Sequence, residues 1–344
     1  MTDTWSSSCL GLPKAISIHV DIPFPMDERK FDLLTPSDPA EQQHPLANDD
    51  TSSQQSPASS SSSPPSGFFA NSTLAQASRI NQLLWEVRSF NVRVVSGQLA
   101  GDDIDAEVVR LSSAIEGWWA ELPAEMANTQ DNMAYWASLG FGQSFVTLLM
   151  NYFHAGQLLH YQFLHQSQQY ASITEASSPP LPRHSSVTAF AATCYRHAEG
   201  LCDLIYRASR TPGAEPCYPL ASHVLVISST VQVYTLLFSP DEVAIARARA
   251  RLERNFEFLT WLETYWPSLD ASLAKFKDFH EACLRSKDSY FRLDQWMLRF
   301  MLDFARPLHG RAASAENGGG GGGGGEGRGG DWSLSTFGLE QYPE

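Results

Sequence analysis

The sequence predicts an all-α protein, an irregular bundle of several helices with disordered linker and tail segments. The main observation is that apolar residues recur at spacings of three and four along most of the chain, which is the spacing of one face of an α-helix. No stretch alternates apolar and polar residues over the length of a half-buried strand. Hydrophobic residues make up 43% of the 344 residues, which is enough to build a sizeable core.

Three low-complexity segments divide the chain. Residues 36–67 are mostly Ser, Pro, Gln and Asp, and such a segment cannot bury enough apolar surface to offset its ordering entropy. A shorter break is predicted at residues 166–186, and the glycine-rich run at residues 318–330 is predicted to be a flexible tether. The expected organisation is an entry segment at 1–35, a disordered linker at 36–67, a helical domain at 68–307, and a tether with a tail at 308–344.

The first two predicted helices have clear start and stop signals. One follows Ser72, whose hydroxyl can cap a helix N-terminus, and its apolar positions run from Ile80 to Val94. The next covers residues 104–122, and we expect it to end before Pro123, because proline breaks the hydrogen bonding of a helix interior.

Three predicted helices follow, and two of them are apolar on nearly every side. Residues 135–159 are predicted to form one buried helix. Residues 185–208 are predicted to form an amphipathic helix capped by Ser185 or Ser186. Residues 220–238 contain many β-branched side chains, which a strand would also accept, but their length favours a helix.

The last part of the domain is predicted to contain one long helix and two shorter ones. The long helix covers residues 240–264 and opens with Pro240 and Asp241, which are typical of a helix N-terminus. The shorter helices are expected at residues 268–285 and 293–304.

The charge of the chain limits its partners. The formal net charge is -14, and the sequence pI is about 5.1. A surface this acidic repels the phosphate backbone of nucleic acids, so we expect no direct nucleic-acid binding and no DNA-binding residues.

The cysteines and the hydropathy pattern suggest an intracellular protein. The five cysteines are few, odd in number and scattered, which favours reduced thiols over a disulfide framework; they are Cys9, Cys194, Cys202, Cys217 and Cys283. The N-terminal residues MTDTWSSSCLGLP lack the basic start and apolar centre of a signal peptide. Since no run of about 18 purely apolar residues is present, we also expect no membrane-spanning segment.

Several clusters of titratable residues could suggest chemistry, but each has a simpler interpretation. His154, His160 and His165 lie at spacings of six and five, which do not place all three on one helical face, so we interpret them as core or surface histidines. The carboxylates and arginines of the last helices are interpreted as a solvated face with internal ion pairs; they are Glu253, Glu257, Glu263, Asp278, Glu281, Arg247, Arg249, Arg251 and Arg254.

No sequence motif indicates an enzyme. The chain contains no G-x-S-x-G, no H-E-x-x-H and no phosphate-binding glycine loop, because the glycine run is followed by neither Lys-Ser nor Lys-Thr. We therefore predict no catalytic, cofactor-binding or metal-binding residues.

Six segments share an order and spacing with one known family. They are LGLPKAISIHVDIPFP at residues 10–25, the W-x-x-x-L-P pattern of Trp118, Leu122 and Pro123, LLMNYFHAGQLLHYQFLH at 148–165, TAFAATCYRHAEGLCDLI at 188–205, WLETYWPSL at 261–269 and FRLDQWMLRFMLDFARP at 291–307. Together they resemble the C-terminal part of the regulatory domain, or middle homology region, of fungal zinc-cluster transcription factors.

The resemblance also shows what this chain lacks. The DNA-binding module of the family needs six closely spaced cysteines around two zinc ions, and the sequence contains no Cys-x2-Cys pair. Zinc is therefore expected only if a missing N-terminal cluster exists. In the family, a further block of helices would precede residue 10, so the resemblance suggests the second half of a larger domain and allows for a truncated gene product.

The resemblance implies a role in the nucleus. It suggests a transcription-regulator domain that acts through coregulators, a full-length homologue or a small-molecule effector, with a possible pocket among Tyr152, His154 and His160. The tail at residues 331–344 alternates acidic and aromatic residues, which suits either a disordered end or an activation segment. The alternative is that the helical scaffold has been repurposed as a small-molecule binder or an enzyme.

Overall fold

The computed structural model describes residues 72–167, 182–266 and 269–288. Within these ranges the chain forms helices and no strand, which confirms the predicted all-α fold. The entry segment, the linker at 36–67, the predicted helix at 293–304, the glycine tether and the tail lie outside the described residues.

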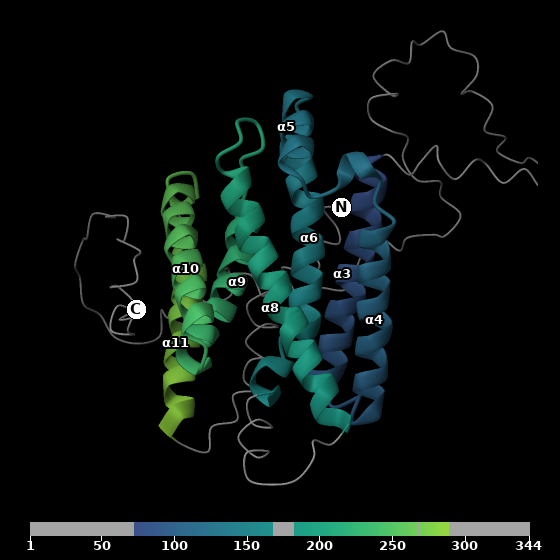
Figure 1. Cartoon of the computed structure of the whole chain (residues 1–344), viewed down its shortest axis with the longest axis vertical. Coiled ribbons are helices and arrows are strands. Elements are labelled where there is room, and N and C mark those ends of the chain that lie inside the picture. The colour runs from purple at the N-terminus through teal and green to yellow at the C-terminus, as the bar shows by residue number, and fades with distance from the viewer. Residues whose placement is uncertain (1–71, 168–181, 267–268, 289–344) are drawn as a thin grey trace, which may run out of the picture.

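The helices pack with their axes roughly along one direction (Figure 1). At one side, α3 pairs with α4; in the middle, α6 packs against α8; at the other side, α9 is covered by α10 and α11. Because α6 contacts α3, α4, α5, α8 and α9, it is the centre of the bundle. The elements are α3 (Thr73–Val95), α4 (Asp102–Ala120), η1 (Ala124–Met126), α5 (Gln130–Ser138), α6 (Gly142–His160), α8 (Pro182–Ala208), α9 (Pro219–Phe238), α10 (Glu242–Glu263) and α11 (Asp270–Asp288).

Three predicted helix ends are confirmed. The Ser72 hydroxyl accepts a hydrogen bond from the backbone N–H of Ala75 at 3.0 Å and caps α3. The Asp241 carboxylate caps α10 by accepting from the N–H of Val243 at 2.9 Å. Helix α4 ends at Ala120, shortly before Pro123.

The single helix predicted at residues 135–159 is wrong, because the structure contains two helices, α5 and α6, in this region. Gly140 separates them with a φ of 81°, a left-handed conformation that glycine adopts without the steric cost of a side chain. The N–H groups of Gly140 and Phe141 bond to the carbonyls of Ala137 and Trp136, as in a Schellman helix cap.

The predicted start of the fourth helix is also wrong. Helix α8 begins at Pro182 rather than after Ser185 or Ser186, and both serines lie exposed within its first turns. Proline is well suited to the first turn of a helix, because its missing N–H would have no partner there in any case. The predicted break at residues 166–186 is therefore shorter than expected.

Helix α9 is the most apolar helix among the described residues. Pro219–Phe238 is long and apolar enough to cross a membrane, with a hydropathy of 1.5, but 89% of this window is buried inside the bundle. Several of its buried hydroxyls bond to its own backbone, as Ser229 does to the carbonyl of Leu225 at 2.8 Å. The helix is therefore interpreted as the core helix of this bundle.

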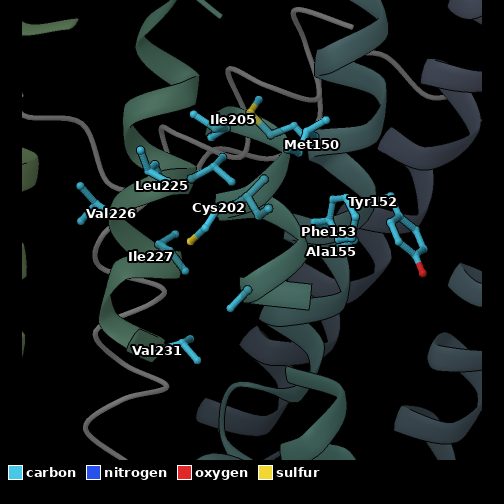
Figure 2. Close-up of a cluster of buried hydrophobic side chains, with 14 of the residues drawn as sticks. Met150, Tyr152, Phe153, Ala155, Cys202, Ile205, Leu225, Val226, Ile227 and Val231 are labelled. Atoms are coloured by element: carbon cyan, nitrogen blue, oxygen red, sulfur yellow. The ribbon is translucent and has the colours of Figure 1, made fainter. Parts of the chain in front are cut away.

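The core lies where α6, α8 and α9 meet. Figure 2 shows Cys202 and Ile205 of α8 between Met150 of α6 and Ile227 of α9. All four side chains are almost completely buried. Three cysteines among the described residues have free thiols; they are Cys194, Cys202 and Cys217.

Two glycines bring α6 and α8 close together. A Cβ added to Gly156 of α6 would overlap the imidazole of His197 on α8, and a Cβ added to Gly200 of α8 would overlap the ring of Phe153 on α6. Each helix therefore packs one aromatic ring against a glycine of the other helix. The residue numbers increase in opposite directions along the contact, so the two helices are antiparallel.

We predict that Gly156→Ala lowers the free energy of unfolding by about 1–3 kcal/mol, although alanine favours helices, because the buried His197 ring must move. Gly117→Ala is the matched control, since it also replaces a glycine within a helix but adds its Cβ to open space. The control should be neutral or stabilise the protein by up to about 1 kcal/mol. Urea unfolding followed by circular dichroism measures both variants, and equal stability changes would contradict this packing.

Candidate functional site

The structure separates the three histidines that the sequence groups together. His154 and His160 are buried on α6, and His165 follows that helix. The ring of His154 lies 6.1 Å from that of His223 on α9, whereas the ring of His160 stacks 6.4 Å from that of His197 on α8. Among residues 72–167, 182–266 and 269–288, no group of three His, Cys, Asp or Glu side chains could hold a metal ion.

The pocket suggested among Tyr152, His154 and His160 has a different arrangement. Tyr152 and His160 both face His197, since the ring of Tyr152 lies 5.0 Å from the His197 ring. The Nδ1 atom of His154 instead lies 3.1 Å from the side-chain amide nitrogen of Gln157. Tyr152 and His160 therefore belong to one polar cluster, and His154 belongs to another.

The first cluster joins α4, α6 and α8 through a carboxylate that the sequence reasoning missed. Glu116 of α4 accepts hydrogen bonds from Arg196 at 2.7 Å and from the Tyr152 hydroxyl at 3.2 Å, and it lies 3.5 Å from Nε2 of His197. Trp119, which is also on α4, stacks on Tyr152 of α6 with ring centroids 4.1 Å apart. No local sequence signal marks this cluster, because Glu116 and His197 are far apart in the chain.

The electrostatics of this cluster favour a neutral imidazole. Burial lowers the pKa of His197, and the nearby Glu116 only partly opposes this effect. The hydrogen bond from His197 lowers the pKa of Glu116, and the positive charge of Arg196 lowers it further. Partial burial of the carboxylate acts in the opposite direction but does not outweigh them. At neutral pH, His197 can therefore donate one N–H to an ionised carboxylate without carrying a charge itself.

Two imidazole nitrogens of this cluster have no hydrogen-bond partner within the described part of the chain. They are Nε2 of His160 and Nδ1 of His197, and both are buried. The Nδ1 atom of His160 pairs with the carbonyl of Gly156 at 2.8 Å. Since the backbone of Gly156 also covers the His197 ring, the cluster is suited to fixing the positions of the helices rather than to contacting a substrate.

The second cluster surrounds Gln157 in the centre of the bundle. Its side-chain oxygen accepts from the hydroxyl of Ser228 on α9 at 2.8 Å, and its backbone carbonyl accepts from the thiol of Cys194 on α8 at 3.6 Å. A similar bridge is formed by Asn255 of α10, which donates to Ser229 of α9 at 2.9 Å. These bonds satisfy polar groups that would be costly to bury alone.

The interpretation of the α10 arginines as an ion-pairing face is confirmed for Arg251. Its guanidinium lies 2.9 Å from Glu199 and 3.5 Å from Asp203 of α8. Arg254 instead lies over the ring of Tyr206 at 4.6 Å. Other side chains of the predicted solvated face are exposed; they are Arg247, Glu253, Glu257, Asp278 and Glu281.

A surface groove lies between α3 and α4. It has a volume of about 430 Å³, and sequence reasoning gave no sign of it. Its lining residues are Ser78, Arg79, Gln82, Leu83, Ala114, Gly117, Trp118 and Glu121.

Comparisons with known proteins add no relative to this description. No family model, no curated protein and no solved structure matches the chain. The functional interpretation therefore depends on the residues and the geometry described above.

We predict that acid destabilises the protein through its buried histidines. Burial lowers the pKa of His160 to about 4 and that of His223 to about 3, so both are neutral in the folded state. Unfolding exposes them to water, where an imidazole has a pKa of about 6.5, so the unfolded state binds more protons as the pH falls below that value. His160 alone should remove about 2 kcal/mol of stability at pH 5 relative to pH 8.

Urea unfolding across this pH range measures the effect. His160→Gln keeps a polar side chain but removes the titration, so its stability should depend less on pH than that of the native chain. A free energy of unfolding that stays constant between pH 8 and pH 5 would contradict the neutral, buried state of these rings.

Proposed function

We propose that the chain is a transcription-regulator domain of the fungal zinc-cluster type, acting in the nucleus through contacts with coregulators, a full-length homologue or a small-molecule effector. In this proposal the chain has no DNA-binding module and no enzymatic activity of its own. Its role is to present a helical surface and an acidic-aromatic tail to other regulators.

The packing of α6 against α8 carries the proposal. Two family-like segments, residues 148–165 and 188–205, provide the facing surfaces of this central pair. The W-x-x-x-L-P segment also reaches it, because Trp118 of α4 stacks near Tyr152 of α6 with ring centroids 6.0 Å apart. Segments that resemble one family, in the same order, thus contact one another in one bundle, as expected if they form one domain.

The charge and the tail support protein contacts as the mode of action. With a formal net charge of -14, the chain is electrostatically unsuited to bind a phosphate backbone. The tail DWSLSTFGLEQYPE combines acidic and large apolar residues, a composition that suits docking in the hydrophobic groove of a coregulator.

We predict that the full chain, fused to an unrelated DNA-binding domain in a fungal host, changes the expression of a reporter gene several-fold. Deletion of residues 331–344 should remove most of the effect, because it removes the aromatic side chains that would contact a coregulator. Deletion of residues 51–64, which have the same length but a Ser/Pro composition, is the matched control and should have little effect.

Two results would contradict the proposal. One is a silent reporter together with a fluorescently tagged chain that stays outside the nucleus. The other is tight, sequence-specific binding of DNA by the chain alone in a gel-shift assay, since the proposal gives the chain no DNA-binding module.

A further inference from the structure

Ion pairs between α3 and α4 lie at one end of the groove and beyond the other. Arg79 of α3 and Glu121 of α4 lie 4.0 Å apart and both line the groove. About one helical turn beyond the opposite end, Arg110 of α4 pairs with Glu86 of α3 at 3.0 Å. Between these pairs the small residues Ser78, Ala114 and Gly117 lie beside the larger Gln82, Leu83 and Trp118, and the groove is short.

Gly117 leaves space that the bundle does not use. It lies within α4, where glycine costs up to about 1 kcal/mol relative to alanine. Gly156 and Gly200 are needed for close packing, but a Cβ added at Gly117 would meet no other atom within 4 Å. Internal packing among the described residues therefore gives no reason for a glycine here, whereas a molecule lying in the groove would need this space.

Trp118 adds a second, independent observation. Its side chain lines the groove and only 6% of the residue is exposed. The indole N–H has no hydrogen-bond acceptor within the described residues. A buried donor without a partner costs about 1–3 kcal/mol, and an acceptor brought by a ligand would recover this energy. The indole nitrogen is itself covered by the protein, so the indole would have to move before it could donate to such an acceptor.

We propose that this groove binds a flat, neutral and mostly apolar small molecule that carries a carbonyl-type hydrogen-bond acceptor. The apolar body would lie against Leu83, Ala114 and Gly117, with the acceptor directed to the indole of Trp118. A neutral ligand is favoured because the lining contains one positive and one negative side chain, Arg79 and Glu121. This site does not depend on the proposed role in transcription.

The size of the groove selects a small molecule over a partner helix. Its volume of about 430 Å³ lies in the usual range of small-molecule sites, roughly 300–1,000 Å³. A docked helix would need an apolar strip that continues over several turns. Between α3 and α4, the charged pairs Arg79–Glu121 and Glu86–Arg110 interrupt such a strip.

The test uses Prodan, a flat, neutral naphthyl ketone whose fluorescence shifts to the blue in an apolar site. Added to the full chain, it should show a saturable blue shift with a one-to-one stoichiometry. Gly117→Leu should weaken its binding at least tenfold, because the added side chain starts in open space and would occupy part of the groove. Ala106→Leu adds the same side chain to an exposed position of α4 outside the groove and should leave the affinity unchanged.

Trp118→Phe separates the hydrogen bond from the packing, since it keeps an aromatic ring but removes the N–H. We expect a loss of affinity of about fivefold, corresponding to one hydrogen bond of about 1 kcal/mol. Circular dichroism establishes that each variant keeps its helical content. The proposal is overturned if the native chain shows no saturable binding, or if Gly117→Leu and Ala106→Leu bind the dye equally well.

Discussion

The close antiparallel contact of α6 and α8 is the constraint on which the rest of the structure depends. Gly156 and Gly200 remove the side chains that would hold these helices apart, and the rings of His197 and Phe153 occupy the space. Because α6 also contacts α3, α4, α5 and α9, the position of this pair sets the position of the surrounding helices. The same contact brings two of the family-like segments together, so the proposed function and the fold depend on one feature.

Close packing has an electrostatic consequence. The imidazoles of His154, His160 and His197 are enclosed by the bundle and are neutral in the folded state, because burial lowers the pKa of each. Their polar atoms are partly satisfied by Glu116, by Gln157 and by backbone carbonyls. The histidines therefore specify how the helices meet, and they make the stability of the contact depend on pH.

Local signals made much of the fold predictable, whereas contacts distant in sequence were not. The caps at Ser72 and Asp241 depend on a few neighbouring residues, and the length of the apolar segment that forms α9 favoured a helix despite its β-branched side chains. The break at Gly140 was missed because apolar residues continue across it. Neither the contact of Glu116 with His197 nor the groove between α3 and α4 could be predicted, since each requires the relative position of separate helices.

Native-state hydrogen exchange tests the central role of the α6–α8 contact most directly. If this contact organises the bundle, the backbone amides of residues 153–157 and 197–202 should exchange only through global unfolding and should be among the slowest in the protein. Exchange of these amides through local opening, at rates well above those of the outer helices α3 and α10, would contradict the account.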